Sequence, residues 1–90
     1  MRLKRFPLGE IIITPKAHDQ LETVEIRTAL RRHAQGDWGE LRPQEILENE
    51  RALREGYRLF SLYRDHLERS FCVVTAADRS MTLGSGFEEH

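Results

Sequence analysis

Ninety residues with a formal net charge of −1 leave room for one domain around one small hydrophobic core. The near-zero charge gives no general field that would attract nucleic acid or an anionic membrane. A hydrophobic fraction of 39% beside a charged fraction of 32% is ordinary for a globular protein and excludes a disordered one. We therefore treat residues 1–90 as a single domain.

The first half of the chain predicts a strand followed by helices. Residues 8–14 hold three consecutive isoleucines, which favour a strand, and their closing threonine with the proline after it is a typical helix start. The apolar positions of residues 15–35 lie on two nearly opposite helix faces, which one straight helix cannot bury together. We therefore predict two helices with a break near Thr23, which caps the second, and a left-handed end at Gly36.

The second half predicts a third helix and three strands. Pro43 begins this helix and Gly56 follows its end. Beyond it the apolar period changes from helical to alternating, with strands at residues 57–63, 71–75 and 81–83. Short connections make these strands an antiparallel meander. The predicted fold is α+β, with two to three helices packed on one face of a small antiparallel sheet that includes the N-terminal strand.

For three residues a structural role is the main expectation and a functional role is the alternative. Trp38 lies in the linker GDWGELR between the second and third helices, where it can pack over both helix ends. Asp37 either holds the turn or caps the next segment. A ligand- or base-stacking role for the indole is the alternative. Asn49 interrupts the apolar stripe of the third helix, so it either bonds to the tryptophan linker or contacts a ligand. His33 is read as a buried structural histidine, with general acid–base use as its alternative.

Three segments of the chain together resemble one protein family. They are RRHAQGDWGE, NERALREGYRLFSLY and VVTAADRSMTLG. Over residues 9–84 the chain resembles a family of small uncharacterised bacterial proteins, associated with plasmids and other mobile elements, that share a Gly-Asp-Trp-Gly motif and an Ala-Asp-Arg-Ser hairpin. The resemblance implies a fold and candidate residues, without an activity. Ala76 stands where the family pattern favours glutamate, so any chemistry of that glutamate is missing here.

Polar residues of the predicted strands and turns are the candidate binding residues. Ser61 and Tyr63 project from one face of their strand and Arg58 from the other. Arg79 is expected near Arg58 and the REGYR corner, where the two arginines would need a carboxylate such as Glu55 or Asp78, or a ligand. The complete candidate set is Arg58, Ser61, Tyr63, Thr75, Asp78, Arg79 and Ser80.

Two functions from different classes fit these observations. The first is a non-catalytic protein-interaction or accessory module of a mobile element, which binds a protein partner through the sheet edge or the final hairpin. The alternative is a small ribonuclease of the toxin type, acting through Arg58, Tyr63, Asp78 and Arg79. The charge balance counts against the ribonuclease, because phosphate binding usually needs a basic surface.

Metal, membrane and compartment can also be addressed from the sequence. The histidines are scattered without metal-ligand spacing, so we expect no metal and no cofactor. No segment approaches the roughly 20 apolar residues of a membrane span. The N-terminal MRLKRF lacks the apolar part of a signal peptide, and the single cysteine, Cys72, has no partner for an intrachain disulfide. A cytoplasmic protein without membrane contact is the expectation.

Overall fold

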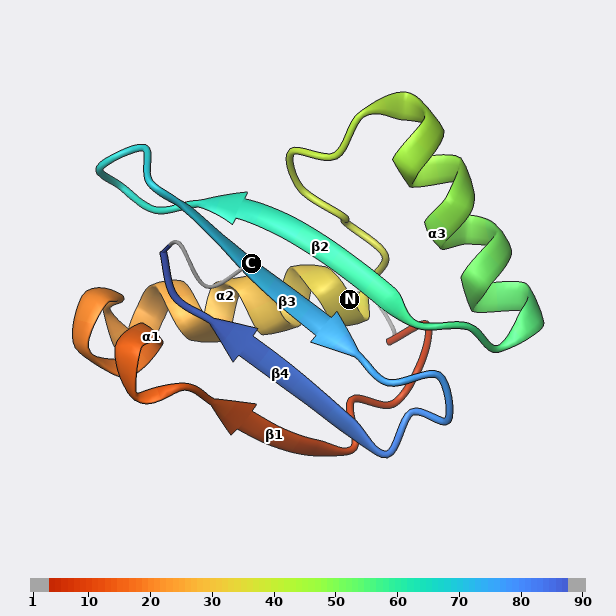
Figure 1. Ribbon diagram of the computed structural model, residues 1–90, viewed down its shortest axis with the longest axis horizontal. Coiled ribbons are helices and arrows are strands. Elements are labelled where there is room, and N and C mark those ends of the chain that lie inside the picture. Colours follow the sequence, from red (N-terminus) through yellow and green to blue (C-terminus); the bar gives the residue numbers. More distant parts are fainter. Residues whose placement is uncertain (1–3, 88–90) are drawn as a thin grey trace.

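The structure is a computed structural model that describes residues 4–87 of the chain. It has the predicted α+β fold, with the N-terminal strand, three helices and the C-terminal meander in the expected order (Figure 1). The elements are β1 (Glu10–Ile13), α1 (Pro15–Gln20), α2 (Thr23–Ala34), α3 (Pro43–Glu55), β2 (Leu59–Arg64), β3 (Ser70–Thr75) and β4 (Met81–Ser85).

The four strands form one mixed sheet in the order β1-β4-β3-β2. Strands β2, β3 and β4 are successive antiparallel neighbours, which confirms the meander. Strand β1 differs from the expected antiparallel sheet, because it pairs parallel to β4 with Ile12 opposite Leu83. Parallel neighbours require a long connection, and the three helices with β2 and β3 supply it here.

The predicted break in the helical run is present. Leu21 and Glu22 separate α1 from α2, and Gly36, just beyond α2, has a left-handed φ of 79°. The predicted cap at Thr23 is wrong. Thr23 is already the first residue of α2, because the carbonyl of Glu22 accepts the N–H of Ile26 at 3.1 Å and begins the helical ladder one residue earlier.

Helix α3 lies beside the edge strand β2 (Figure 1). It begins at Pro43, and Gly56 follows its end with a φ of 79°, as predicted. The buried amide of Asn49 accepts the N–H of Phe60 at 3.2 Å and donates to the carbonyl of Phe60 at 2.5 Å. The predicted bond from Asn49 to the tryptophan linker is therefore wrong, and the residue instead occupies two backbone groups of the strand edge.

The tryptophan linker pairs with the same edge two residues further along. The N–H of Glu40 donates to the carbonyl of Leu62 at 2.6 Å, and the N–H of Leu62 donates to the carbonyl of Trp38 at 3.2 Å. Gly39 lies between them with a φ of 76°, and an added Cβ there would meet the carbonyl oxygen of Leu62 at 2.0 Å. This close approach requires glycine.

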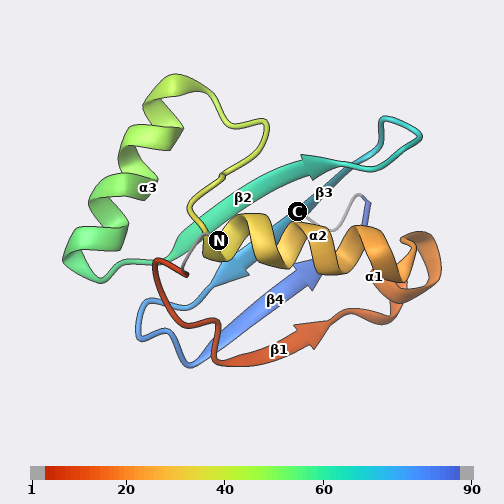
Figure 2. The same ribbon diagram turned by 180° about the vertical axis from the view of Figure 1, so that it is seen from behind.

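Helix α2 covers one face of the sheet, and the two views from opposite sides show it behind the strands and then in front of them (Figures 1 and 2). The core lies between this helix, α1 and the strands, where Leu59, Tyr63 and Val73 are almost completely buried. Within residues 4–87 no helix crosses the opposite face (Figure 1). We call that side of the sheet the uncovered face.

Trp38 is buried, as predicted, with 3% of its surface exposed. Its indole stacks on Phe6 with ring centroids 6.1 Å apart and meets the His33 ring edge-on at 5.6 Å. Its N–H donates to Glu50 of α3 at 2.8 Å, and Glu50 also accepts hydrogen bonds from both terminal nitrogens of Arg5. The indole therefore joins the N-terminal segment, the end of α2 and helix α3.

We predict that Trp38→Ala lowers the free energy of unfolding by about 3–5 kcal/mol, because it removes a buried ring and leaves a cavity. Trp38→Phe retains an aromatic ring against Phe6 and loses the bond to Glu50, so its loss should be smaller. Urea unfolding of the three proteins measures both values. A Trp38→Ala protein as stable as the parent would contradict the buried position of the indole.

Candidate functional site

A chain of buried hydrogen bonds runs through the interface between α2 and the sheet. His33, on α2, contacts Ser61 of β2 through Nδ1 at 2.5 Å and Thr75 of β3 through Nε2 at 2.9 Å. The Thr75 hydroxyl lies 2.7 Å from that of Thr82 on β4, which donates to the carbonyl of Leu8 at 2.7 Å. The four side chains are fully buried. One imidazole thus links a helix, three strands and the N-terminal segment.

The last bond fixes the direction of the whole chain. The Thr82 hydroxyl gives its hydrogen to Leu8, so its oxygen accepts from Thr75. Thr75 has then used its own hydrogen and must accept from His33 Nε2. A neutral imidazole with its proton on Nε2 presents Nδ1 as an acceptor, which the Ser61 hydroxyl fills. Every group is satisfied with His33 neutral.

The environment of His33 also favours the neutral form. Burial, together with the positive charge of Arg79, lowers its pKa from 6.5 to about 4. At neutral pH the ring carries no charge and both of its nitrogens are occupied. The geometry therefore favours a structural role for His33 over general acid–base chemistry, because neither ring nitrogen is exposed.

Tyr63 is buried on the same face of β2 as Ser61. Its hydroxyl donates to the carbonyl of Asp37 at 2.7 Å, and burial raises the pKa of the phenol. The Asp37 carboxylate accepts two bonds from Arg32, at 2.7 and 3.1 Å, and the Arg32 guanidinium lies 4.7 Å from the centre of the Tyr63 ring. Asp37 therefore fixes the end of α2 and the tryptophan linker, as a turn-holding residue.

Arg79 turns inward over the β3–β4 turn. One terminal nitrogen donates to the carbonyl of Tyr57 at 2.6 Å and the other to that of Ala52 at 3.1 Å, with two further bonds to carbonyls of its own turn. The contact with Tyr57 confirms the position expected near the REGYR corner. Its guanidinium caps the carbonyls where α3 ends and β2 approaches.

The carboxylate partners expected for Arg79 are wrong. The Asp78 side chain instead accepts the N–H of Ser80 at 3.0 Å, which closes the turn. Hydrogen bonds from the side chain and the backbone of Ser80 hold the pKa of Asp78 below its usual value. The backbone carbonyls at the C-terminal end of a helix can stabilise a cation, so Arg79 needs no carboxylate there. Asp78 and Ser80 thus hold the turn, while Arg79 fastens it to α3.

The Arg58 side chain is exposed. It borders a groove between α3 and β2 at the rim of the uncovered face. Two glutamates on one wall give this groove a mixed charge, which does not resemble a phosphate-binding surface. The groove is lined by Leu41, Glu45, Glu48, Asn49, Arg58 and Phe60.

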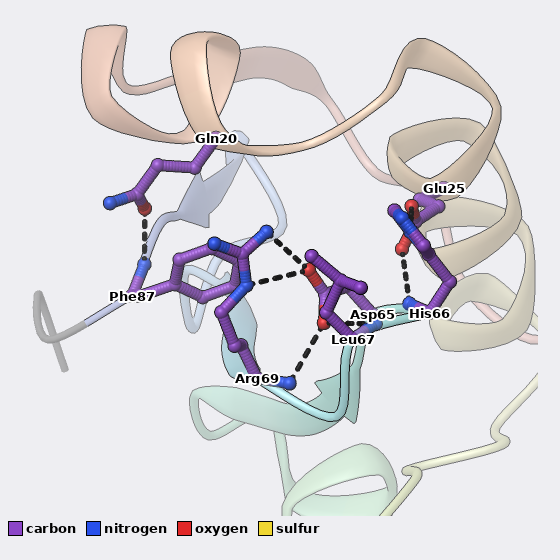
Figure 3. Close-up of polar contacts among 7 residues, drawn as sticks. All are labelled: Gln20, Glu25, Asp65, His66, Leu67, Arg69 and Phe87. Carbon is purple, nitrogen blue, oxygen red and sulfur yellow. Dashed lines mark hydrogen bonds and ion pairs between the residues drawn. The ribbon is translucent and has the colours of Figure 1, made fainter.

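A second polar cluster, at the β2–β3 turn, was not predicted from the sequence (Figure 3). The Asp65 side chain accepts the N–H groups of Leu67 and Arg69 and the Arg69 guanidinium, all at 2.8–3.1 Å. Burial works against the charge of Asp65, but these bonds outweigh it and lower its pKa. Arg69 lies over the Phe87 ring at 4.3 Å. The run DHLERS signalled a polar turn, but not its buried carboxylate.

The same turn reaches helix α2 through His66. Its Nδ1 lies 2.6 Å from Glu25, which raises the pKa of the imidazole (Figure 3). Together with Glu22 these residues place three ligand atoms within 4.8 Å of one another. Exposed acidic groups often gather in this way without a metal, and the His66–Glu25 ion pair accounts for the arrangement.

The uncovered face is apolar across all four strands. Ile12, Leu83, Val74 and Phe60 are successive register partners, so their side chains form one continuous row on this side of the sheet. Ile12 is 37% exposed and the other three are half-buried. A sheet with one face against helices normally presents polar residues on the other. The sequence carried this signal, because LFSLY and FCVVT are apolar at both alternating sets of positions.

No family model, curated protein or solved structure matches the chain. The resemblance to mobile-element proteins therefore rests on sequence motifs alone. None of the helices within residues 4–87 combines the length and hydropathy that a membrane crossing requires.

We predict that His33 makes the protein less stable in mild acid. Its pKa is about 4 in the folded state and 6.5 in the unfolded state, so the unfolded chain binds the additional proton between these values. Stability from the neutral ring is complete above pH 6.5 and is lost as the pH falls toward 4, by about 3 kcal/mol in total.

Urea unfolding across this pH range tests the prediction. His33→Gln does not titrate, so its stability should fall less steeply than that of the parent protein. His66→Gln is the control: the pKa of His66 is raised, so its contribution has the opposite sign and the acid-induced loss should remain in this variant. Parallel profiles for the parent and His33→Gln would show that the ring titrates normally.

Proposed function

We propose that the chain is a small, non-catalytic protein-interaction module whose docking surface is the uncovered face of the sheet. The single observation that carries the proposal is the apolar row Ile12–Leu83–Val74–Phe60. An apolar row that crosses a whole sheet face with no helix over it is the kind of surface patch that often serves in binding. The resemblance adds the setting, an accessory protein of a mobile element.

The candidate polar residues support this class of function over a ribonuclease. Ser61, Tyr63 and Thr75 are buried and hydrogen-bonded, and the Arg79 guanidinium is occupied by carbonyls. A nuclease acting through Tyr63 and Arg79 would have to break these contacts before touching a phosphate. The formal net charge of −1 gives such a substrate no general attraction.

The partner surface is mainly apolar with charges at one rim. The groove beside Phe60 carries Glu45 and Glu48 on one wall and Arg58 nearby. A partner with an apolar centre and a basic flank would match this arrangement, because rim charges set orientation more than affinity. We place this interaction in the cytoplasm, because the chain has a single cysteine, Cys72, and a reducing compartment keeps such a thiol reduced.

Site-specific photo-crosslinking in cells that contain the chain natively tests the proposal. We predict that a benzophenone amino acid in place of Val74 crosslinks to a protein, and that adding Leu83→Lys abolishes the adduct. Leu47 is the matched control, since it is apolar and 70% exposed but lies on α3. Absence of a Val74 adduct, equal adducts at the two positions, or crosslinking to RNA would contradict the proposal.

A further inference from the structure

The two edges of the sheet are treated differently. At β2 the outward backbone groups of Phe60 and Leu62 are occupied by Asn49 and the tryptophan linker. At β1 the sheet ends without a neighbour within residues 4–87. Natural proteins usually blunt such an edge by keeping the strand very short or with lysine, proline or a bulge. This strand is short, with four residues, but three of them are successive isoleucines, of which Ile11 is 47% exposed.

The hydrogen bonds between β1 and β4 show which backbone groups of β1 point away from the sheet. Glu10 and Thr14 each donate their N–H to a β4 carbonyl at 3.0 Å. Since strand residues alternate, Ile12 also faces β4, whereas Ile11 and Ile13 direct their N–H and C=O groups away from the sheet. Unpaired strand groups of this kind are a template for another strand.

We propose that the strand completing this edge is β1 of a second copy of the chain, paired antiparallel about a two-fold axis at Ile12. The inference rests on the proposed function, because it extends the same uncovered face by a dimer. In this register Ile11 of one copy faces Ile13 of the other, and each such pair exchanges two N–H···O=C bonds. The two Ile12 residues then face each other at the axis.

Two-fold axes at the neighbouring residues are excluded by the backbone. Centring the axis on Ile13 would set Ile11 opposite Pro15, which has no N–H and begins α1. Centring it on Ile11 would set Ile13 opposite Gly9, whose φ of 66° is not that of a strand. Only the axis at Ile12 pairs extended, outward-facing residues on both copies.

Side chains also match in this register. On the uncovered face Ile12 meets Ile12 of the second copy, so the apolar row of one copy continues directly into that of the other. On the α2 side, exposed Ile11 packs against Ile13 of the second copy. Glu10 faces Thr14, and no like charges oppose each other within the paired strands.

The dimer also brings the area of the uncovered face closer to that of a typical protein interface. Four strands about 4.8 Å apart and about five residues long form a surface of roughly 300 Å², well below the ~800 Å² that a stable partner covers. Pairing through β1 doubles that surface to roughly 600 Å², which approaches this size. Because the shared edge is short, we expect a dimer that dissociates on dilution.

A charge swap at the axis tests the register. Sedimentation equilibrium of the whole chain should show a concentration-dependent dimer, with Ile12→Lys and Ile12→Glu each monomeric because like charges meet at the axis. An equimolar mixture of the two variants should dimerise. The same swap at Ile11 should not give this rescue, because Ile11 faces Ile13. A parent chain that stays monomeric throughout, or a mixture that stays monomeric, would overturn the proposal.

Two further variants separate edge pairing from other modes. Ile11→Pro removes an N–H that points away from β4, so the monomer should remain folded while dimer affinity falls about tenfold or more. Val74→Lys should leave this dimer intact; its loss would indicate association through the faces and contradict the edge proposal. A monomeric parent whose Val74 position still crosslinks to another protein would refute self-pairing alone and leave the proposed function standing.

Discussion

The fold depends on one buried imidazole. His33 bonds directly to β2 and β3 and, through Thr75 and Thr82, is joined to β4 and the N-terminal segment. An unpaired polar group in this position would cost about 1–3 kcal/mol, a large fraction of the stability of a small domain. The path is closed only when α2, the meander and Leu8 are all in place, so it selects this arrangement of helix on sheet.

This arrangement makes both sides of the sheet unusual. Hydroxyl and imidazole groups lie among the core residues on the covered side, while an apolar row lies on the uncovered side. The two edges of the sheet also differ. Asn49 and the tryptophan linker occupy the edge at β2, whereas no described segment pairs with the edge at β1. The polar residues that attract attention in the sequence therefore account for folding, and the apolar surface is where we place function.

Local features of the fold could be predicted from the sequence, and long-range pairings could not. The opposed apolar faces around Thr23 revealed the break between helices, and Pro43 and Gly56 marked the bounds of α3, because these signals act within a few residues. The parallel pairing of β1 with β4 left no local trace, since Ile12 and Leu83 carry no information about their partner. Asn49 was recognisable as a polar residue in an apolar stripe, but its partner depended on where β2 would lie.

The candidate site shows the same division. His33, Ser61 and Thr75 were each singled out, yet their separations of 28 and 42 residues concealed that they form one chain of bonds. Arg79 was placed at the correct corner and given the wrong partners, because backbone carbonyls have no sequence signature. The apolar uncovered face was detectable in β2 and β3, because they carry apolar residues on both faces, but the same pattern also fitted a sheet buried on both sides.

The most direct test of the account is a long-range ¹H–¹⁵N correlation spectrum of the histidine side chains. The hydrogen-bond chain predicts that His33 is neutral at pH 7 with its proton on Nε2, and that it keeps this form well below its usual pKa of 6.5. A proton on Nδ1, or a ring that titrates near 6.5 in the folded protein, would contradict the structural role of His33 and return it to the list of groups available for chemistry.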